Sequence, residues 1–315
     1  MSSHLTYLEA SVVGLIQGVT ELFPVSSLGH NVLIPALIGG SWGSDLSVAK
    51  AESPYLAFIV GLHAATAIAL LIYFWRDWIR IFRGFFTSIR HLELETTDQK
   101  LAWMVILATI PVGLVGLGFE HEFRVLFGKP IRAAIFLVVN GVILYAGEKF
   151  RTRASLKADA ELAADRQHAV SKAGRGAAAH ASGQRAARQL ELSRAVQAVV
   201  IGSAQILALL AGISRDGVTM VAGMARGLSR EDAARFAFLL ATPVILAAGV
   251  LKYNDLIQKG HGIYGPILVG SILSGLGAYL SVRYLVKYFQ TRTLTPFAIY
   301  CILFGTASII YLSVK

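Results

Sequence analysis

Five polar side chains that could carry out hydrolysis occur within one apolar stretch near the N-terminus. They are Gln17, Glu21, Ser26, Ser27 and His30. A polar group buried without a hydrogen bond costs roughly 2–7 kcal/mol, so a cluster of this kind needs a compensating role. A carboxylate, a hydroxyl and an imidazole together can form a hydrolytic centre, and ionisable groups inside apolar segments of membrane proteins are functional by default.

The spacing of these residues predicts that they meet at a break between two helices. Gln17 and Glu21 are four residues apart and share one helix face, and Pro24 then removes a backbone donor and ends that helix. Ser26 or Ser27 can cap the next helix, leaving the other hydroxyl available. A purely structural interpretation is that Glu21 and His30 pair between packed helices. The cluster as a whole favours the catalytic interpretation.

A second polar break lies far along the chain, where a glycine-flanked segment opens a helix at Ser214, Arg215 and Asp216. The start of a helix presents backbone N–H donors, and a guanidinium adds a planar fork that suits phosphate oxygens. This segment therefore predicts a phosphate-binding site. The alternative is an ion pair that pins two helices, formed by Arg215 with Asp216 or with Glu21.

The composition places both breaks in a membrane protein. The chain has 315 residues, of which 55% are hydrophobic and 15% charged, and its mean hydropathy is +0.60. A soluble domain is rarely so apolar. The net charge of +10 does not imply a nucleic-acid partner, because the basic residues lie mostly between apolar spans rather than on one face. The only cysteine, Cys301, lies in an apolar run and excludes a disulfide framework.

We therefore expect an all-α, polytopic integral membrane protein with two re-entrant helical hairpins, 5–38 and 195–227. Irregular backbone at membrane depth is tolerated only where protein or a water-filled cavity covers it, so the breaks predict a cavity. His63 is expected to be a hydrogen-bonded core residue within its span, and Pro111 to kink another. A surface helix is expected at 79–89 and a polar loop at 39–53. The expected spans are 55–75, 103–119, 131–147, 236–251, 264–286 and 295–312.

A weak internal repeat divides the chain into two membrane halves, 1–147 and 195–315, joined by a basic linker, 148–194. The segment 18–21 resembles 202–205, and 107–112 echoes 240–244. Interrupted helices at corresponding positions of two halves predict a site where the halves meet. Four connections (76–100, 149–194, 226–235 and 283–293) hold 21 of the 29 Lys and Arg residues, and the opposite connections and tail hold 7. The positive-inside rule makes the first set cytoplasmic and puts both termini outside.

The two motifs together resemble the bacterial undecaprenyl pyrophosphate phosphatase family, the bacitracin-resistance protein. Its acidic motif falls on Gln17 and Glu21, and its serine and histidine fall on Ser27 and His30. The phosphate motif of the family falls on three further residues. These are Ser214, Arg215 and Thr219. Two positions depart from the family pattern: Ala211 replaces a proline, and Asp216 replaces a serine and adds negative charge beside the arginine.

The resemblance implies a membrane phosphatase of the bacterial inner membrane that acts on a polyprenyl diphosphate lipid, with a cavity open to the periplasmic face. Glu21, Ser27 and His30 are the expected catalytic residues, with His30 as base for Ser27 or for a water. Ser26 joins the phosphate motif in holding the substrate, and Gln17 with Glu21 is expected to bind a divalent cation, Mg²⁺ or Ca²⁺. A homodimer is left open. The alternative function is a transporter of a polyprenyl phosphate or another anion through the same site.

Overall fold

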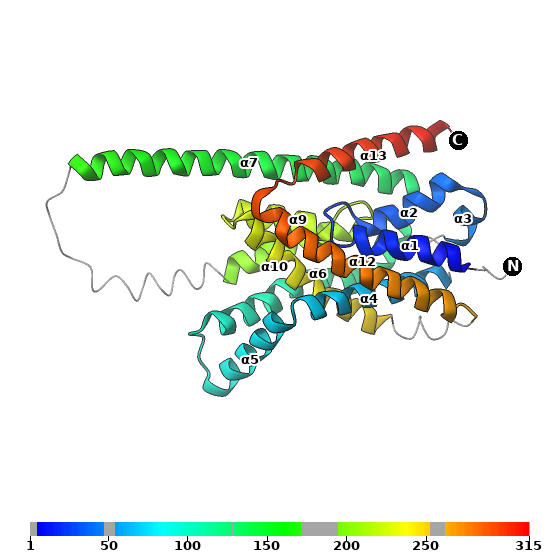
Figure 1. Ribbon diagram of the computed structural model, residues 1–315, viewed down its shortest axis with the longest axis horizontal. Coiled ribbons are helices and arrows are strands. Elements are labelled where there is room, and N and C mark those ends of the chain that lie inside the picture. The colour runs from blue at the N-terminus through cyan, green and yellow to red at the C-terminus, as the bar shows by residue number, and fades with distance from the viewer. Residues whose placement is uncertain (1–4, 47–53, 128, 172–194, 253–261, 315) are drawn as a thin grey trace.

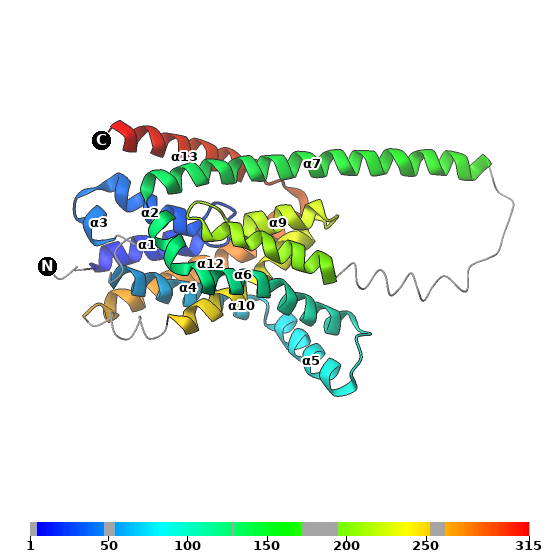
Figure 2. The same cartoon turned by 180° about the vertical axis from the view of Figure 1, so that it is seen from behind.

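The computed structural model describes residues 5–46, 54–127, 129–171, 195–252 and 262–314, and in these ranges the regular elements are all helices. Five of the helices are long and apolar enough to cross a membrane, or six if a bent pair counts as one span. The prediction of an all-α, polytopic membrane protein is confirmed. The long helices run side by side along one axis (Figures 1 and 2).

The N-terminal hairpin consists of α1 (Tyr7–Thr20) and α2 (Ser27–Ile38). Thr6 and Glu9 form a reciprocal capping box that begins α1. At 14 residues, α1 is about 21 Å long, which is shorter than the ~30 Å hydrocarbon core of a bilayer. The chain turns back inside the bundle, and α3 (Gly40–Asp45) follows at the end that carries the N-terminus, within the segment expected to be a loop.

The second hairpin enters from the opposite end of the bundle (Figure 1). Residues 195–203 are α-helical and continue into the 3₁₀ helix η1 (Ala204–Leu209), and α9 (Arg215–Ala225) returns after the break. Small residues let each hairpin pack closely on a crossing helix. A side chain at Gly18 would collide with the backbone of Ser274, and one at Gly202 would collide with the backbone of Ala108. Thus Gly18 and Gly202, paired by the weak repeat, occupy comparable positions.

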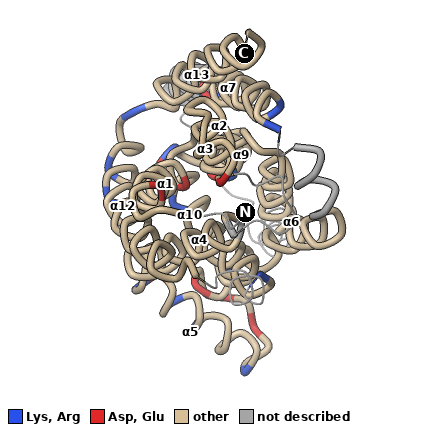
Figure 3. The backbone as a smooth tube through the Cα atoms, turned by 90° about the vertical axis from the view of Figure 1, so that its right-hand side faces the viewer, with Lys and Arg blue, Asp and Glu red and all other residues tan. Residues whose placement is uncertain are grey.

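The remaining long helices surround the two hairpins. They are α4 (Pro54–Tyr73), α6 (Thr97–Phe127), α7 (Pro130–Ser171), α10 (Arg230–Leu251), α12 (Tyr264–Thr291) and α13 (Thr295–Val314). Helix α12 packs on α1 and α4, and α13 packs on α7. In α6 the backbone departs from helical angles at Phe119 rather than at Pro111, where the sequence predicted a kink. Figure 3, viewed from the end that carries both termini, shows acidic residues between α1 and α9 inside the bundle.

The predicted surface helix is α5 (Trp75–His91), which bends away from the preceding span by 83°. Ile79, Phe82 and Phe86 are exposed on it, and Trp78 and Ile81 face the bundle. An amphipathic helix of this kind, rich in arginine, suits the membrane–water interface. The helix lies at the end of the bundle opposite the termini (Figure 1), where the connections rich in Lys and Arg also begin.

Candidate active site

The two breaks meet inside the bundle. Ser26 caps α2 by accepting a hydrogen bond from Gly29 N (3.2 Å), and the same Oγ accepts one from Gly212 N in the second break (3.2 Å). Ser26 has a positive φ of 68°, which is unusual for a residue other than glycine. Its hydroxyl is therefore used to join the two hairpins, while the hydroxyl of Ser27 is directed elsewhere.

Glu21 lies at the centre of the site and is almost completely buried. Its Oε1 accepts a hydrogen bond from Arg215 Nη2 (2.9 Å). Its Oε2 accepts hydrogen bonds from Ser27 Oγ and from Gln17 Nε2 (3.0 Å). His63 Nε2 lies 3.3 Å from the same oxygen. One carboxylate thus connects the nucleophile candidate of the first break to the guanidinium of the second.

Arg215 occupies the first position of α9, after the N-cap Ser214. Its Nη1 donates to the carbonyl oxygen of Ala241 (3.3 Å), and its Nε lies 3.4 Å from Asp216 Oδ1. Both ion pairs that the sequence offered as alternatives to phosphate binding are therefore present. A guanidinium has five N–H groups, and three of those on Arg215 have partners in the described part of the chain. The other two are available for phosphate oxygens.

A cavity of about 190 Å³ opens beside these residues. Hairpin residues and residues of α4, α6 and α10 form its wall. The polar residues that line it are Glu21, Ser26, Ser27, His63, Gln205, Ser214 and Arg215. The other lining residues are apolar and include Val112 on α6 and Ile245 on α10, so a small polar centre lies next to an apolar wall. This arrangement suits an amphiphile with an anionic head.

His30 lies in a different place from the other two expected catalytic residues, Glu21 and Ser27. It does not line the cavity, and both of its ring nitrogens are engaged elsewhere: Nδ1 with the carbonyl oxygen of Ser26 and Nε2 with the hydroxyl of Tyr300, each at 2.7 Å. The ring stacks against Tyr300 and Phe304 of α13. As positioned, His30 supports the backbone of the break through the Ser26 carbonyl oxygen, and its ring nitrogens make no hydrogen bond to Ser27. Nor does it pair with Glu21.

Thr219 does not line the cavity either. Its hydroxyl donates to the carbonyl oxygen of Arg215, one turn back along α9 (2.7 Å), and the side chain is buried. Ser214 lines the cavity, and its Oγ caps α9 by accepting from Gly217 N (3.1 Å). Of the expected phosphate ligands, Arg215 and Ser214 face the cavity together with Ser26, and Thr219 does not.

Two residues of the site were not predicted from sequence. His63 was interpreted as a core residue. Its Nδ1 donates to the carbonyl oxygen of Ile59 (2.9 Å), as a core histidine would, but its Nε2 lies 3.3 Å from Glu21 Oε2. Asn140 on α7 is fully buried and bridges the breaks. Its Nδ2 donates to the Pro24 carbonyl oxygen (3.0 Å), and its Oδ1 accepts from Ser214 N (3.0 Å). The sequence signal that could have identified His63 was an ionisable side chain within an apolar span. The corresponding signal for Asn140 was an amide side chain within an apolar span.

The predicted cation site can be tested against the donor atoms. Gln17 presents its NH₂ group to Glu21, because its carbonyl oxygen accepts from Asn31 Nδ2 (2.6 Å). Both oxygens of Glu21 are already bonded to donors. In the described ranges no group of three or more His, Cys, Asp or Glu side chains could hold a metal ion. Gln17 and Glu21 as arranged therefore do not form a cation site by themselves.

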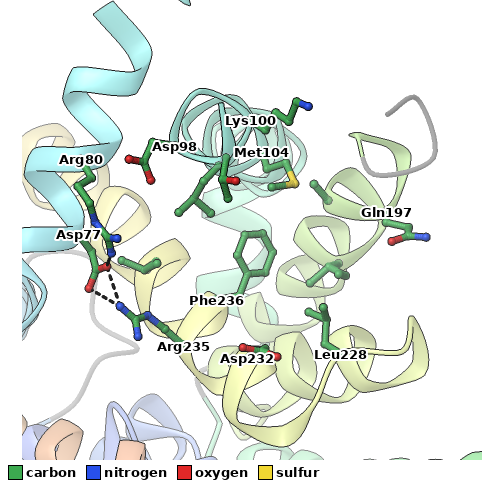
Figure 4. Close-up of a pocket in the computed structure, with 15 residues that line it drawn as sticks. Asp77, Arg80, Asp98, Lys100, Met104, Gln197, Leu228, Asp232, Arg235 and Phe236 are labelled. Atoms are coloured by element: carbon green, nitrogen blue, oxygen red, sulfur yellow. Dashed lines mark hydrogen bonds and ion pairs between the residues drawn. The ribbon is translucent and has the colours of Figure 1, made fainter. Parts of the chain in front are cut away.

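A larger hollow, about 810 Å³, lies at the end of the bundle near α5 (Figure 4). Asp77, which lines this hollow, forms ion pairs with two arginines. Arg235 Nη2 donates to both carboxylate oxygens of Asp77 (2.7 and 2.8 Å), and Arg80 also pairs with it. This cluster fastens α5 to α10 close to the bend between α4 and α5. Ser27, Glu21 and Arg215 do not line this hollow, so we place the chemistry in the smaller cavity.

Comparison with known proteins agrees with this assignment. A family model described as bacitracin resistance protein BacA matches residues 10–307. A protein of Mycolicibacterium paratuberculosis named undecaprenyl-diphosphatase is 60% identical over 318 residues, covering 100% of both chains. One of Mycobacterium avium with the same name is 59% identical over the same coverage. A third, undecaprenyl-diphosphatase 2 of Chromobacterium violaceum, is 39% identical over 96% of this chain and 98% of its own.

Proposed function

The chain belongs to the bacitracin resistance protein BacA family, and from this membership and the geometry of the cavity we propose that it hydrolyses undecaprenyl diphosphate to undecaprenyl phosphate and inorganic phosphate. The observation that carries the proposal is the contact of Glu21 with both Ser27 Oγ and Arg215 Nη2 in one buried cavity. A nucleophile with a bound base next to an anion-binding fork is the arrangement that phosphoryl transfer requires.

The proposed reaction begins with binding of the diphosphate by Arg215. Its two unpartnered N–H groups, together with the start of α9, would neutralise charge on the terminal phosphate. The polyprenyl chain would lie along the apolar wall formed by α6 and α10. Binding close to Arg215 competes with its ion pair to Glu21, which leaves that carboxylate more basic toward Ser27.

Ser27 Oγ would then attack the terminal phosphorus. The new P–O bond forms as the bond to the bridging oxygen breaks, and its electron pair leaves with the lipid monophosphate. Glu21 Oε2, already hydrogen-bonded to Ser27 Oγ, takes the proton. Water subsequently hydrolyses the phosphoserine, and Glu21 returns the proton to Ser27. His30, with both nitrogens engaged, would hold Ser26 in place rather than act as the base.

Mg²⁺ or Ca²⁺ stays a prediction from the sequence. Magnesium is often bound by one or two carboxylates together with substrate phosphates, so an ion would have to arrive with the diphosphate and displace one of the donors on Glu21. We derive no step through it. Self-association into a homodimer likewise stays a prediction.

We further propose that the protein lies in the bacterial inner membrane with both termini and the first hairpin on the periplasmic side. The distribution of Lys and Arg supports this orientation, since the basic connections begin at the opposite end of the bundle. The cavity would then take lipid diphosphate from the outer leaflet.

Phosphate release by the purified protein in detergent tests the function. A single compartment removes any contribution of transport, so hydrolysis of a polyprenyl diphosphate under these conditions supports the enzyme. Binding of a polyprenyl phosphate without phosphate release would favour a transporter and contradict the proposal. Glu21→Gln, purified in the same way, is the matched control for contaminating phosphatases, because it keeps the shape of the side chain and removes the charge.

A further inference from the structure

Gln205 lines the cavity from the second hairpin and has no place in the reaction described above. It is almost fully buried and lies in η1. Its Nε2 makes long hydrogen bonds to the carbonyl oxygens of Ala108 (3.5 Å) and Gly202 (3.4 Å). These two acceptors fix the orientation of the amide, because only its nitrogen can donate to them.

The carbonyl oxygen of Gln205 is consequently left over. It is buried, and it has no hydrogen-bond partner in the part of the chain that the structure describes. More than nine in ten buried polar groups have a partner, so an exception calls for an explanation such as a catalytic role or a bound water. A side chain in the wall of the cavity with one unused acceptor indicates a ligand that donates a hydrogen bond.

The internal repeat gives a second, independent reason. Gly18 and Glu21 of the first hairpin correspond to Gly202 and Gln205 of the second, and both glycines pack against the backbone of a crossing helix. Glu21 and Gln205 thus reach one cavity from opposite hairpins. Glu21 contacts the hydroxyl that attacks in the first step. The neutral amide cannot take a proton at neutral pH, so it suits a group that must be oriented and not deprotonated.

We propose that Gln205 is a further catalytic residue, whose carbonyl oxygen accepts a hydrogen bond from the water that hydrolyses the phosphoserine. This inference rests on the proposed function. A diphosphate is rich in acceptors and offers Gln205 little to bind, whereas water donates. A glutamine that orients the attacking water serves the same purpose in GTPases.

In this step the water oxygen forms a bond to phosphorus, and the bond from phosphorus to Ser27 Oγ breaks with its electron pair remaining on Oγ. Oγ receives the proton that Glu21 held. Phosphate leaves as H₂PO₄⁻ with both hydrogens of the water and ionises in solution. During the attack the carbonyl oxygen of Gln205 accepts a hydrogen bond from one O–H group of the water. This bond orients a lone pair of the water oxygen toward phosphorus.

The test is Gln205→Met, which keeps the length of the side chain and removes the acceptor. A hydrogen bond to a reacting group is worth about 10- to 100-fold in rate, so kcat for phosphate release should fall by up to that factor. KM should fall in parallel, because slowing only the second step leaves kcat/KM unchanged. Acid quenching with substrate labelled in the terminal phosphate should show more phosphoserine at Ser27 than in wild type. Gln197→Met, the same change outside the active cavity, should alter neither quantity.

An unchanged kcat in Gln205→Met would overturn the proposal. So would a fall in kcat without more phosphoserine, because that result would assign Gln205 to packing or to substrate binding. Thermal unfolding in detergent checks that the variant is folded. If wild-type protein released no phosphate at all, the proposed function would fail rather than the assignment of Gln205.

Discussion

Replacing Asn140 by leucine should separate the two breaks while leaving most of the fold intact. The side chain is fully buried and makes two 3.0 Å hydrogen bonds, one to the first break at Pro24 and one to the second at Ser214. Leucine has a similar size and no polar atoms. The substitution therefore leaves a backbone C=O and a backbone N–H buried without their partner.

Each group left in this way costs about 1–3 kcal/mol, so the assembled site loses roughly 2–6 kcal/mol. If the tips of the hairpins part to regain water, the assembled population falls by at least about 30-fold, since 1.4 kcal/mol is a factor of ten. We expect kcat for phosphate release to fall by a comparable factor. The apparent melting temperature should fall by only a few degrees if the opening is local.

The assay is phosphate release in detergent, with thermal unfolding measured on the same sample. Asn140→Asp keeps an acceptor for Ser214 N–H and loses the donor to Pro24, so its effect should be intermediate. Cys301→Ser is the control, because it alters only the weaker contacts of the sulfur, with Asn140 Nδ2 (3.4 Å) and with the Pro24 carbonyl oxygen (3.9 Å). A kcat for Asn140→Leu within threefold of wild type would refute the argument that this bridge holds the two breaks together.

Three further predictions concern the site and its orientation. Arg215→Ala should lower kcat/KM by at least about 100-fold and reduce stability by about 3–5 kcal/mol, because it leaves Glu21 buried without its cation; near-normal turnover would mean that the site is elsewhere. Asp216→Ser should lower KM, since Asp216 Oδ1 contacts the guanidinium that binds phosphate, and a shift of the Mg²⁺ titration with unchanged KM would instead make Asp216 a metal ligand. A cysteine introduced at Gly43 in α3 should react with an impermeant reagent from outside, and one at Leu92, the C-cap of α5, only from the cytoplasm; the reverse labelling would overturn the orientation.

The sequence predicted the fold well because its strongest signals are local. The apolar segment 5–23 carries Glu9, Gln17 and Glu21 and is followed by Pro24, so a full crossing was doubtful and a hairpin was favoured without any knowledge of the neighbouring helices. The second break carries its own cap, Ser214, and is recognised in the same way. The weak repeat also paired 18–21 with 202–205, and in the structure Gly18 and Gly202 both pack against the backbone of a crossing helix.

The parts of the site that depend on distant helices were not predictable from local spacing. His30 follows Ser27 by three residues and was assigned to the reaction, but Tyr300 of α13 and the Ser26 carbonyl group bind both of its nitrogens. His63 lies in an apolar helix without a polar neighbour in sequence. Only the packing of α4 on the first hairpin brings it to Glu21. Spacing along one helix reports which residues share a face, and not which helix that face meets.

The other echo in the sequence, 107–112 with 240–244, pairs α6 with α10, which pack against each other. Helix α6 packs on η1 and α10 packs on α9, so both contact the second hairpin, whereas equivalent helices of the two halves would contact one hairpin each. Apolar helices share so few residue types that short matches arise without a structural relationship. The match between 18–21 and 202–205, which includes a glycine and a polar residue, was the informative one.

The central claim is that Ser27, activated by Glu21, attacks the terminal phosphate. It is tested most directly by quenching the purified protein in acid during turnover of a polyprenyl diphosphate labelled in the terminal phosphate, followed by digestion and mapping. The account predicts label on the peptide that contains Ser26 and Ser27, its loss in Ser27→Ala, and its loss in Glu21→Gln because the base is removed. Full hydrolysis by Ser27→Ala, with no labelled peptide in the wild type, would contradict the account.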